Sequence, residues 1–481
     1  MGVSTTTIVI LLSVAAVLIV TGITVGSYWM IIYSNLLLKE LILTPTSTSY
    51  NIWKEIPIPM YLNLYLWNWT NPEEFKIGSD VKPNFVQMGP YVFKEQHVKV
   101  NQTWNENGTI TFQQRRIWHF QESMSNGSLD DEVTNINVIA TVRLLSTVVK
   151  LKAFTLTVTK TAGELLFEGY DDTLIDFARN HSSLNIPFDR FGWFYGRNGS
   201  ETYDGVFNMH TGESDVSNLG ELDKWNYRNR TDFYSGDCGM IKGTTGELWP
   251  PVTNRASVDL FAPDICTSMT LSRTEDASFL GIKGHRFVAD SRTFDNGTDV
   301  PARACYCEEE TCQPSGVLGV SKCKFGAPAY VSLPHFHLAD ESYSNAITGL
   351  NPTNDDYNFA MTLEPTTGIP VNVRAQMQIN ILVEPIKDIK MFTDIPQVFI
   401  PVLWFRQEAF LTDDFARQIN LLLIIPKLRF PICITIGCIG LAIALTASYL
   451  WYQKRAKAGE NQLLIVKEDA NDAARADPVA S

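Results

Sequence analysis

The sequence predicts a β-rich α+β fold in which two transmembrane helices anchor one large extracytoplasmic domain. Two uncharged apolar runs lie near the ends of the chain, and every N-glycosylation sequon lies between them. The clearest pattern in the intervening segment is the two-residue alternation of a β-strand. The chain is therefore divided into a cytosolic N-terminus (1–7), a first span (8–32), an ectodomain (33–429), a second span (430–452) and a cytosolic tail (453–481).

The first apolar run is long enough to cross the hydrocarbon core of a bilayer, which is roughly 30 Å thick, at a rise of about 1.5 Å per residue. A cleaved signal peptide is the alternative interpretation, but such a peptide has a basic leading segment and a shorter apolar stretch. No Lys or Arg precedes residue 8, so the sequence favours an uncleaved anchor. The second run has Lys427 and Arg429 before it and three basic residues after it, which weakly favours a cytosolic C-terminus.

The sequons indicate the compartment of the middle segment, because N-glycans are added only in the lumen or outside the cell. They are Asn68, Asn101, Asn107, Asn126, Asn180, Asn198, Asn229 and Asn296. Since none lies in either terminal segment, we expect a hairpin topology with both termini in the cytosol. Plasma membrane is the expected location, with endosomes or lysosomes as a second one.

Six of the 8 cysteines are clustered between Cys238 and Cys323, inside the segment that carries the sequons. An even, clustered set in an oxidising compartment is typical of disulfides. Zinc is the alternative, because Cys305, Cys307 and Cys312 are close together. Their spacing lacks the paired knuckles of common zinc sites, so no metal is expected.

The formal net charge of −13 resides in the ectodomain, because acidic and basic residues balance in the tail. This acidity argues against a nucleic-acid partner. Residues 133–163 are an exception, since they contain no Asp or Glu but carry Arg143, Lys150, Lys152 and Lys160. Apolar residues at helical spacing predict a helix here; they are Ile136, Ile139, Val142, Leu145 and Val149. The segment is a candidate anion-binding surface, and an ordinary solvated helix face is the alternative.

Residues 371–381 alternate strictly between apolar and polar side chains. This pattern predicts a strand with one buried face and one solvated face. Catalytic motifs such as G-x-S-x-G and H-E-x-x-H are not found, and His335 and His337 are assigned a structural role. The sequence therefore does not predict an enzyme, nor a cofactor.

A series of motifs along the ectodomain resembles the class B scavenger receptor family, which includes a platelet fatty-acid receptor, a high-density-lipoprotein receptor and a lysosomal integral membrane protein. The motifs are Trp53-Lys54 with Pro57, Pro59 and Tyr61; Asn68 with Thr70-Asn71-Pro72; Gly89-Pro90-Tyr91; Gly196 with Asn198-Gly199; Cys238 with Ile241 and Gly243-Thr244; Pro250-Pro251; Phe261 with Asp264 and Cys266; Cys305-Tyr306-Cys307; Ser332-Leu333-Pro334-His335-Phe336; Gly349-Leu350-Asn351-Pro352; and Pro401 with Trp404. They cover nearly the whole ectodomain.

The resemblance implies an irregular antiparallel β-barrel with an apical helical bundle and an internal tunnel. It implies a receptor that binds lipids, lipoproteins or lipid-bearing particles and mediates their uptake or transfer through the tunnel. A lysosomal or endosomal receptor that sorts a protein cargo, and an adhesion or phagocytic receptor for apoptotic cells, are the alternatives. Homo-oligomers are possible, and Gly22 with Gly26 in the first span, or Gly440 with Ala444 in the second, would permit close helix contacts.

The resemblance also implies disulfides Cys238–Cys305, Cys266–Cys323 and Cys307–Cys312. In the fatty-acid receptor, a Lys-x-Lys pair shortly before a Glu-Leu-Leu-x-Gly-Tyr motif contacts anionic lipids. Lys150 and Lys152 hold the similar place here, before residues 164–170, which contain one extra residue between Phe167 and Gly169. This departure puts the register in doubt.

The tail contains an acidic residue four positions before a Leu-Ile pair, namely Glu460 before Leu464 and Ile465. This spacing is that of an acidic dileucine sorting signal, and the lysosomal relative carries a signal of this type. Clathrin adaptors are therefore possible partners, in a tail that we expect to be disordered. A chance match or a short amphipathic turn on the membrane is the alternative.

Overall fold

The structure is a computed structural model that describes residues 3–75, 81–141, 155–179, 188–307, 312–385, 392 and 395–475. The chain forms two compact units. One unit combines Met1–Lys39 with Arg417–Ser481, and the other is Glu40–Ala416. Each unit is described by itself below.

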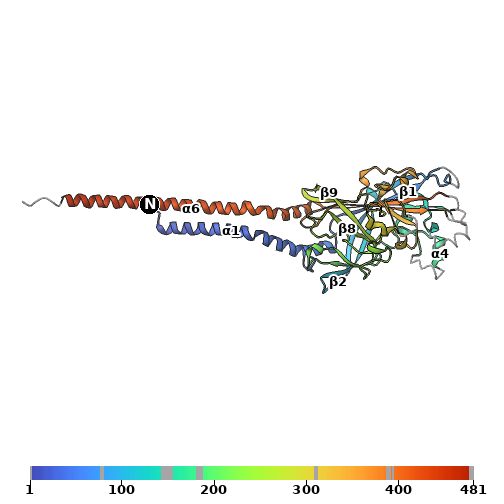
Figure 1. Ribbon diagram of the computed structural model, residues 1–481, viewed down its shortest axis with the longest axis horizontal. Helices are drawn as coiled ribbons and strands as arrows, with labels where there is room; N and C mark the ends of the chain where they lie inside the picture. Colours follow the sequence, from blue (N-terminus) through green and yellow to red (C-terminus); the bar gives the residue numbers. More distant parts are fainter. Residues whose placement is uncertain are drawn as a thin grey trace, which may run out of the picture. The chain divides into compact units, whose positions relative to one another are not determined.

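Two helices, α1 (Thr5–Leu41) and α6 (Asp413–Arg475), run side by side (Figure 1) and are the two described helices long and apolar enough to cross a membrane. Small residues allow their close approach. A Cβ added to Gly22 would lie 3.3 Å from the carbonyl oxygen of Cys433, and one added to Gly440 would lie 2.9 Å from Cγ1 of Ile19. The small residues noted in both spans are therefore used between the two spans of one chain.

The expectation of a disordered tail is wrong for the described residues, because α6 continues from the second span to Arg475. The reason is composition. Ala, Leu, Lys, Glu and Gln dominate the residues after the span, and these are strong helix formers. Leu464 and Ile465 lie on this helix with 58% and 57% of their surface exposed.

The described ectodomain contains short helices and many antiparallel strands. The helices are α2 (Thr48–Lys54), α4 (Thr173–Arg179) and α5 (Glu341–Asn345). The strands are β1 (Met60–Trp69), β2 (Phe85–Asn105), β3 (Thr109–Phe120), β4 (Glu132–Ile136), β5 (Thr157–Thr161), β6 (Val206–His210), β7 (Leu222–Trp225), β8 (Ser257–Ala262), β9 (Thr267–Phe279), β10 (Ile282–Val288), β11 (Val317–Gly319), β12 (Ala329–Ser332), β13 (Ala360–Leu363), β14 (Pro370–Val383) and β15 (Val398–Phe410).

Among the described residues, thirteen strands form one sheet in the order β7-β6-β3-β2-β1-β15-β14-β13-β10-β9-β8, with β12 also paired to β14 and β11 paired to β12. The core is continuous with this sheet and is rich in aromatic side chains, including Trp67, Trp249 and Trp404. The predicted β-rich class is confirmed. The paired strands do not by themselves close a barrel, because β7 and β8 stand at opposite ends of the order.

A two-residue segment nevertheless joins these end strands. The N–H of Leu222 in β7 donates to the carbonyl of Gly243 (2.8 Å), and the N–H of Thr244 donates to the carbonyl of Asp259 in β8 (3.1 Å). The N–H of Phe261 in β8 donates in turn to the carbonyl of Thr244 (2.9 Å). Residues 243–244 thus satisfy backbone groups on both sheet edges, which would otherwise need other partners.

The helix predicted over residues 133–163 is wrong at both of its ends. Residues 132–136 form β4, which pairs with β5 in a separate two-stranded ribbon, and Ile139–Thr141 form a 3-10 helix. Over so short a run, the apolar positions are compatible with a helix or with a strand. The β-branched residues of Thr157–Thr161 favour a strand. Val142, Leu145 and Val149 lie outside the described residues.

The strand predicted at 371–381 is confirmed as part of β14, but its solvated face is wrong at three positions. Gln376, Gln378 and Asn380 are fully buried. Gln376 donates to the carbonyls of Asp356 (2.7 Å) and Asn358 (2.9 Å). Gln378 donates to Asn380 (2.8 Å), and Asn380 donates to the Ser332 hydroxyl (3.0 Å). These bonds allow the amides to be buried beside β12, the neighbouring strand, without unmet polar groups.

Candidate functional site

The predicted basic surface is described only at Lys160. Arg143, Lys150 and Lys152 lie outside the described residues. Lys160 belongs to β5, opposite Val133 of β4, and its ammonium lies 5.0 Å from the centre of the Tyr170 ring. That contact is a cation–π interaction, in which the cation covers a tyrosine that is itself buried.

The motif that contains Tyr170 has a conformation that accounts for its extra residue. Residues Glu164–Glu168 form a π-helical turn, and the N–H of Gly169 donates to the carbonyl of Glu164 at 3.0 Å. A π turn accommodates one residue more than an α turn. Gly169 then turns the chain with φ at +70°, and a Cβ there would lie 2.7 Å from the Tyr195 ring. The insertion is thus absorbed within the turn.

An aromatic cluster lies beneath this turn. Phe167 packs against Phe93, Trp118 and Phe194, with ring centres 4.6, 5.6 and 5.1 Å apart. Leu165 and Leu166 are buried in the same cluster. The π turn and Tyr170 therefore belong to a buried apolar cluster, and Lys160 contacts that cluster through the Tyr170 ring.

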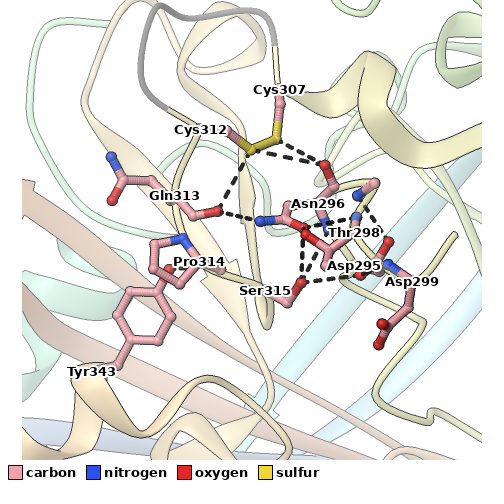
Figure 2. The surroundings of a disulfide bond; sticks show 11 residues. Asp295, Asn296, Thr298, Asp299, Cys307, Cys312, Gln313, Pro314, Ser315 and Tyr343 are labelled. Atoms are coloured by element: carbon pink, nitrogen blue, oxygen red, sulfur yellow. Dashed lines mark hydrogen bonds between the residues drawn. A yellow bond between two sulfur atoms is a disulfide. The ribbon is translucent and has the colours of Figure 1, made fainter. Parts of the chain in front are cut away.

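In the described part of the chain, six cysteines form three disulfides, Cys238–Cys305, Cys266–Cys323 and Cys307–Cys312, with Cα–Cα distances of 5.9, 6.2 and 5.0 Å. This connectivity is the one that the family resemblance implies. It uses the three cysteines on which the zinc alternative depended. Figure 2 shows Cys307–Cys312 beside Asn296, whose amide donates to the carbonyl of Gln313 at 2.9 Å.

A buried ionic network lies on the inward face of β2, and sequence reasoning missed it. His97 is placed between two carboxylates, with Nε2 2.6 Å from Glu95 and Nδ1 2.5 Å from Glu247. Lys99 pairs with the other oxygen of Glu247, and Glu95 accepts a hydrogen bond from Gln407 of β15 at 2.7 Å. Glu95, His97 and Lys99 are 3%, 5% and 1% exposed.

The pKa values in this network reflect a competition between burial and pairing. Burial opposes ionisation of Glu247, but Lys99 and His97 outweigh it and lower the pKa of Glu247 to about 2. Burial would likewise lower the pKa of His97, yet Glu95 and Glu247 raise it above its ordinary value. Burial lowers the pKa of Lys99, and Glu247 opposes that change. In this network, opposite charges thus compensate the cost of burying each charged group.

A second ionic cluster adjoins it through β3. Arg116 pairs with Asp204 at 2.8 Å, and Arg197 pairs with Asp264 at 2.9 Å and with Asp204 at 3.3 Å. The Arg197 guanidinium also lies 4.5 Å from the centre of the Tyr203 ring. Arginine suits such a place because its flat guanidinium can bind carboxylates and stack on rings together. The two clusters connect β2 and β3 to loops far away in the sequence.

Comparison with known proteins identifies the family. The model of the CD36 family matches residues 13–451, which include the whole ectodomain and most of both apolar runs. The chain belongs to the CD36 family. It is 34% identical to Protein peste of Drosophila melanogaster over 91% of this chain and 80% of that protein. It is 37% identical to mouse Scavenger receptor class B member 1 over 77% and 75%, and 31% identical to human Lysosome membrane protein 2 over 82% and 84%.

Family membership confirms the resemblance to class B scavenger receptors. The protein is therefore a scavenger-receptor-like membrane protein. Among this CD36-family protein's described sequon residues, Asn101, Asn107, Asn126, Asn198 and Asn229 are exposed, whereas Asn68 and Asn296 are half-buried. Asn180 lies outside the described residues. The five exposed asparagines are the most accessible glycan acceptors in the folded protein.

The histidines of the family motif occupy structural positions. His335 is stacked on Tyr357, with ring centres 4.0 Å apart, and its Nε2 lies 2.9 Å from the Gln87 amide oxygen. Its Nδ1 accepts from the N–H of Asn351 at 3.1 Å, so Nε2 carries the proton. Burial lowers the pKa of His335 to about 3. His337 contacts the carbonyl of Pro352 at 2.8 Å. Both side chains connect loops.

The strand pattern explains why the ionic network was missed. Glu95, His97 and Lys99 share one face of β2, and Val98 and Val100 share the other. By the usual rule, the charged face would be assigned to solvent. The network becomes visible only when Glu247, which is remote in sequence, is placed beside Lys99.

Proposed function

We propose that this CD36-family protein binds lipids or lipid-bearing particles at the exposed end of its ectodomain and passes lipid through the ectodomain to the membrane. The observation that carries the proposal is the family match over residues 13–451. One of the similar proteins is named a scavenger receptor. Binding and transfer, without chemical change of the lipid, is the activity proposed.

The closed barrel and tunnel belong to this proposal. Support comes from residues 243–244, whose hydrogen bonds join the two end strands of the sheet. A sheet joined in this way can enclose an interior, as antiparallel barrels do. The apical helical bundle also belongs to this proposal.

A panel uptake assay tests the proposed function. Cells with and without the chain would receive fluorescent fatty acid, sterol ester and lipoprotein particles in parallel. We expect faster uptake of at least one lipid class with the chain, and recovery of that lipid in its original chemical form. Equal uptake in both cell types for every class would contradict the proposal, and recovery of a modified lipid would point to an enzyme.

The basic surface provides a first prediction. Replacement of Lys150 and Lys152 together by Glu should reduce binding of anionic lipid particles severalfold, because long-range attraction and charge-assisted contacts are both lost. The difference from the parent should shrink as salt rises. Binding would be measured on intact cells and normalised to surface expression. Replacement by Gln should have an intermediate effect, and unchanged binding of the Glu variant at low salt would return the segment to an ordinary solvated surface.

The tail provides a second prediction. We propose that Glu460, Leu464 and Ile465 form a sorting signal that clathrin adaptors bind. The protein would then be distributed between the plasma membrane and endosomes or lysosomes. Similarity to Lysosome membrane protein 2 favours this division. Leu464→Ala with Ile465→Ala should move the protein to the surface and slow its internalisation at least twofold by antibody uptake. Leu463→Ala is the matched control, and a double variant that internalises like the parent would show that the motif is inert.

A further inference from the structure

The first span is longer than the bilayer needs. No Asp, Glu, Lys or Arg precedes Lys39, so residues 8–38 extend about 46 Å as a helix at 1.5 Å per residue. A hydrocarbon core is roughly 30 Å thick, and a tilt of about 40° would still leave roughly 35 Å along the membrane normal. Part of this uncharged helix must therefore lie outside the hydrocarbon.

Contacts between α1 and α6 fix which part this is. At the cytosolic end, Lys454 donates to the hydroxyl of Thr5 at 2.6 Å. At the other end, the indole N–H of Trp29 donates to the carbonyl of Ile425 at 3.1 Å. Lys427 and Arg429 follow Ile425, so they lie level with the helical turn that precedes Trp29. Residues 430–451 between these cationic levels extend about 32 Å, which matches the hydrocarbon core.

Charged and aromatic side chains mark the two levels as membrane interfaces. Arg455 lies over the Trp451 ring at 4.8 Å, and Arg429 lies over the Phe430 ring at 5.2 Å. Beyond the outer level, residues 30–38 of α1 and 418–426 of α6 continue side by side. We call these two segments the apolar stalk. They contain no charged residue.

The apolar stalk is held together by a hydrogen bond that a proline makes available. Pro426 has no N–H, so the carbonyl of Leu422 lacks its usual intrahelical donor. The Tyr33 hydroxyl donates to this carbonyl at 3.4 Å. The outer surface of the stalk is unusually apolar: Ile31, Ile32 and Leu36 are 54%, 57% and 60% exposed, and Leu421, Ile424 and Ile425 are 67%, 45% and 37% exposed.

Exposed apolar patches of this kind mark sites of interaction. We propose that the apolar stalk binds the hydrocarbon part of a lipid that passes between the outer leaflet and the ectodomain. A lipid is the occupant because, on α1, the stalk surface continues the bilayer-facing surface without a charged residue from residue 8 to residue 38. The inference rests on the proposed function, since it assigns one step of lipid transfer to this surface.

The test uses the full chain in proteoliposomes, with a fluorescent sterol ester in a phospholipid emulsion as the probe. Leu36→Gln with Leu421→Gln makes the stalk polar with residues that keep helix propensity. Leu36→Met with Leu421→Met is the matched control, because it keeps the surface apolar. Emulsion binding and sterol-ester transfer into the bilayer would be measured separately.

We expect the Gln variant to bind emulsion like the parent and to transfer sterol ester at least fivefold more slowly, with the Met variant like the parent. Transfer by the Gln variant at the parent rate would overturn the stalk inference alone. A parent that neither binds nor transfers would overturn the proposed function and this inference with it. A second copy of the chain could cover the stalk in place of lipid, and Leu421→Cys tests this. Complete conversion of this variant to disulfide-linked dimers would also overturn the inference.

Discussion

Gly243→Ala is expected to abolish folding of the ectodomain. Gly243 has φ at +78°, and a Cβ there would lie 1.8 Å from the carbonyl oxygen of Asp259. That oxygen cannot move away, because it belongs to β8 and accepts the N–H of Thr244. Relief of the clash would separate residues 243–244 from β8 and leave backbone groups of both end strands without partners. We expect a loss of more than about 4 kcal/mol, which is at the exceptional end for one substitution.

Gly196→Ala is the matched control for Gly243→Ala. Gly196 has a similar φ of +72°, but a Cβ there would meet nothing within 4 Å. Its cost should be limited to backbone strain, about 1–2 kcal/mol. Thermal unfolding of the purified full chain and the fraction that reaches the cell surface would be measured for both variants. Similar stability of the two variants would show that residues 243–244 are not a tight joint between the sheet edges.

Glu247→Gln is expected to have the second largest effect. Glu247 compensates two buried cations, Lys99 and His97. Its neutral isostere would leave Lys99 buried without a counter-charge, and removal of one partner from a buried pair costs about 3–5 kcal/mol. Glu201→Gln is the control, because the Arg115–Glu201 pair is exposed and should contribute less than about 1 kcal/mol.

The partner of Glu247 provides a further check. Lys99→Met combined with Glu247→Gln should lose much less stability than the sum of the two single variants, because neither buried charge is then left alone. Thermal unfolding of the four proteins under one condition gives this coupling. Additive losses, or a Glu247→Gln loss equal to that of Glu201→Gln, would contradict the role assigned to the network.

The same network predicts how stability depends on pH. The pKa of Glu247 is lowered from 4.5 to about 2, so its contribution is present above pH 4.5 and is lost as the pH falls toward 2. The pKa of His97 is raised from 6.5, so its contribution is complete below pH 6.5 and is lost as the pH rises through the folded-state pKa. The network should therefore stabilise most between pH 4.5 and 6.5, and Glu247→Gln should flatten the Tm profile on the acid side of this window.

Several features of the protein could be predicted from the sequence because they depend on local chain properties. Length and apolarity indicated the two membrane helices, and strict alternation indicated the strand at 371–381. The motifs around Gly243, Cys266 and His335 indicated the family, and the family implied the disulfide pairing. Each of these signals is carried by the side chains themselves or by neighbours a few residues away.

Only the tertiary structure decided which polar and charged side chains are buried and which groups they pair with. Gln378 and Asn380 alternate with apolar residues as solvated side chains do, yet they are buried because Ser332 and Trp67 supply their hydrogen bonds. Glu95 and Lys99 share a charged strand face that turns inward because Glu247 meets it from a remote loop. Whether a polar group is better satisfied by water or by protein depends on partners that approach through space, and the sequence order of those partners does not reveal them.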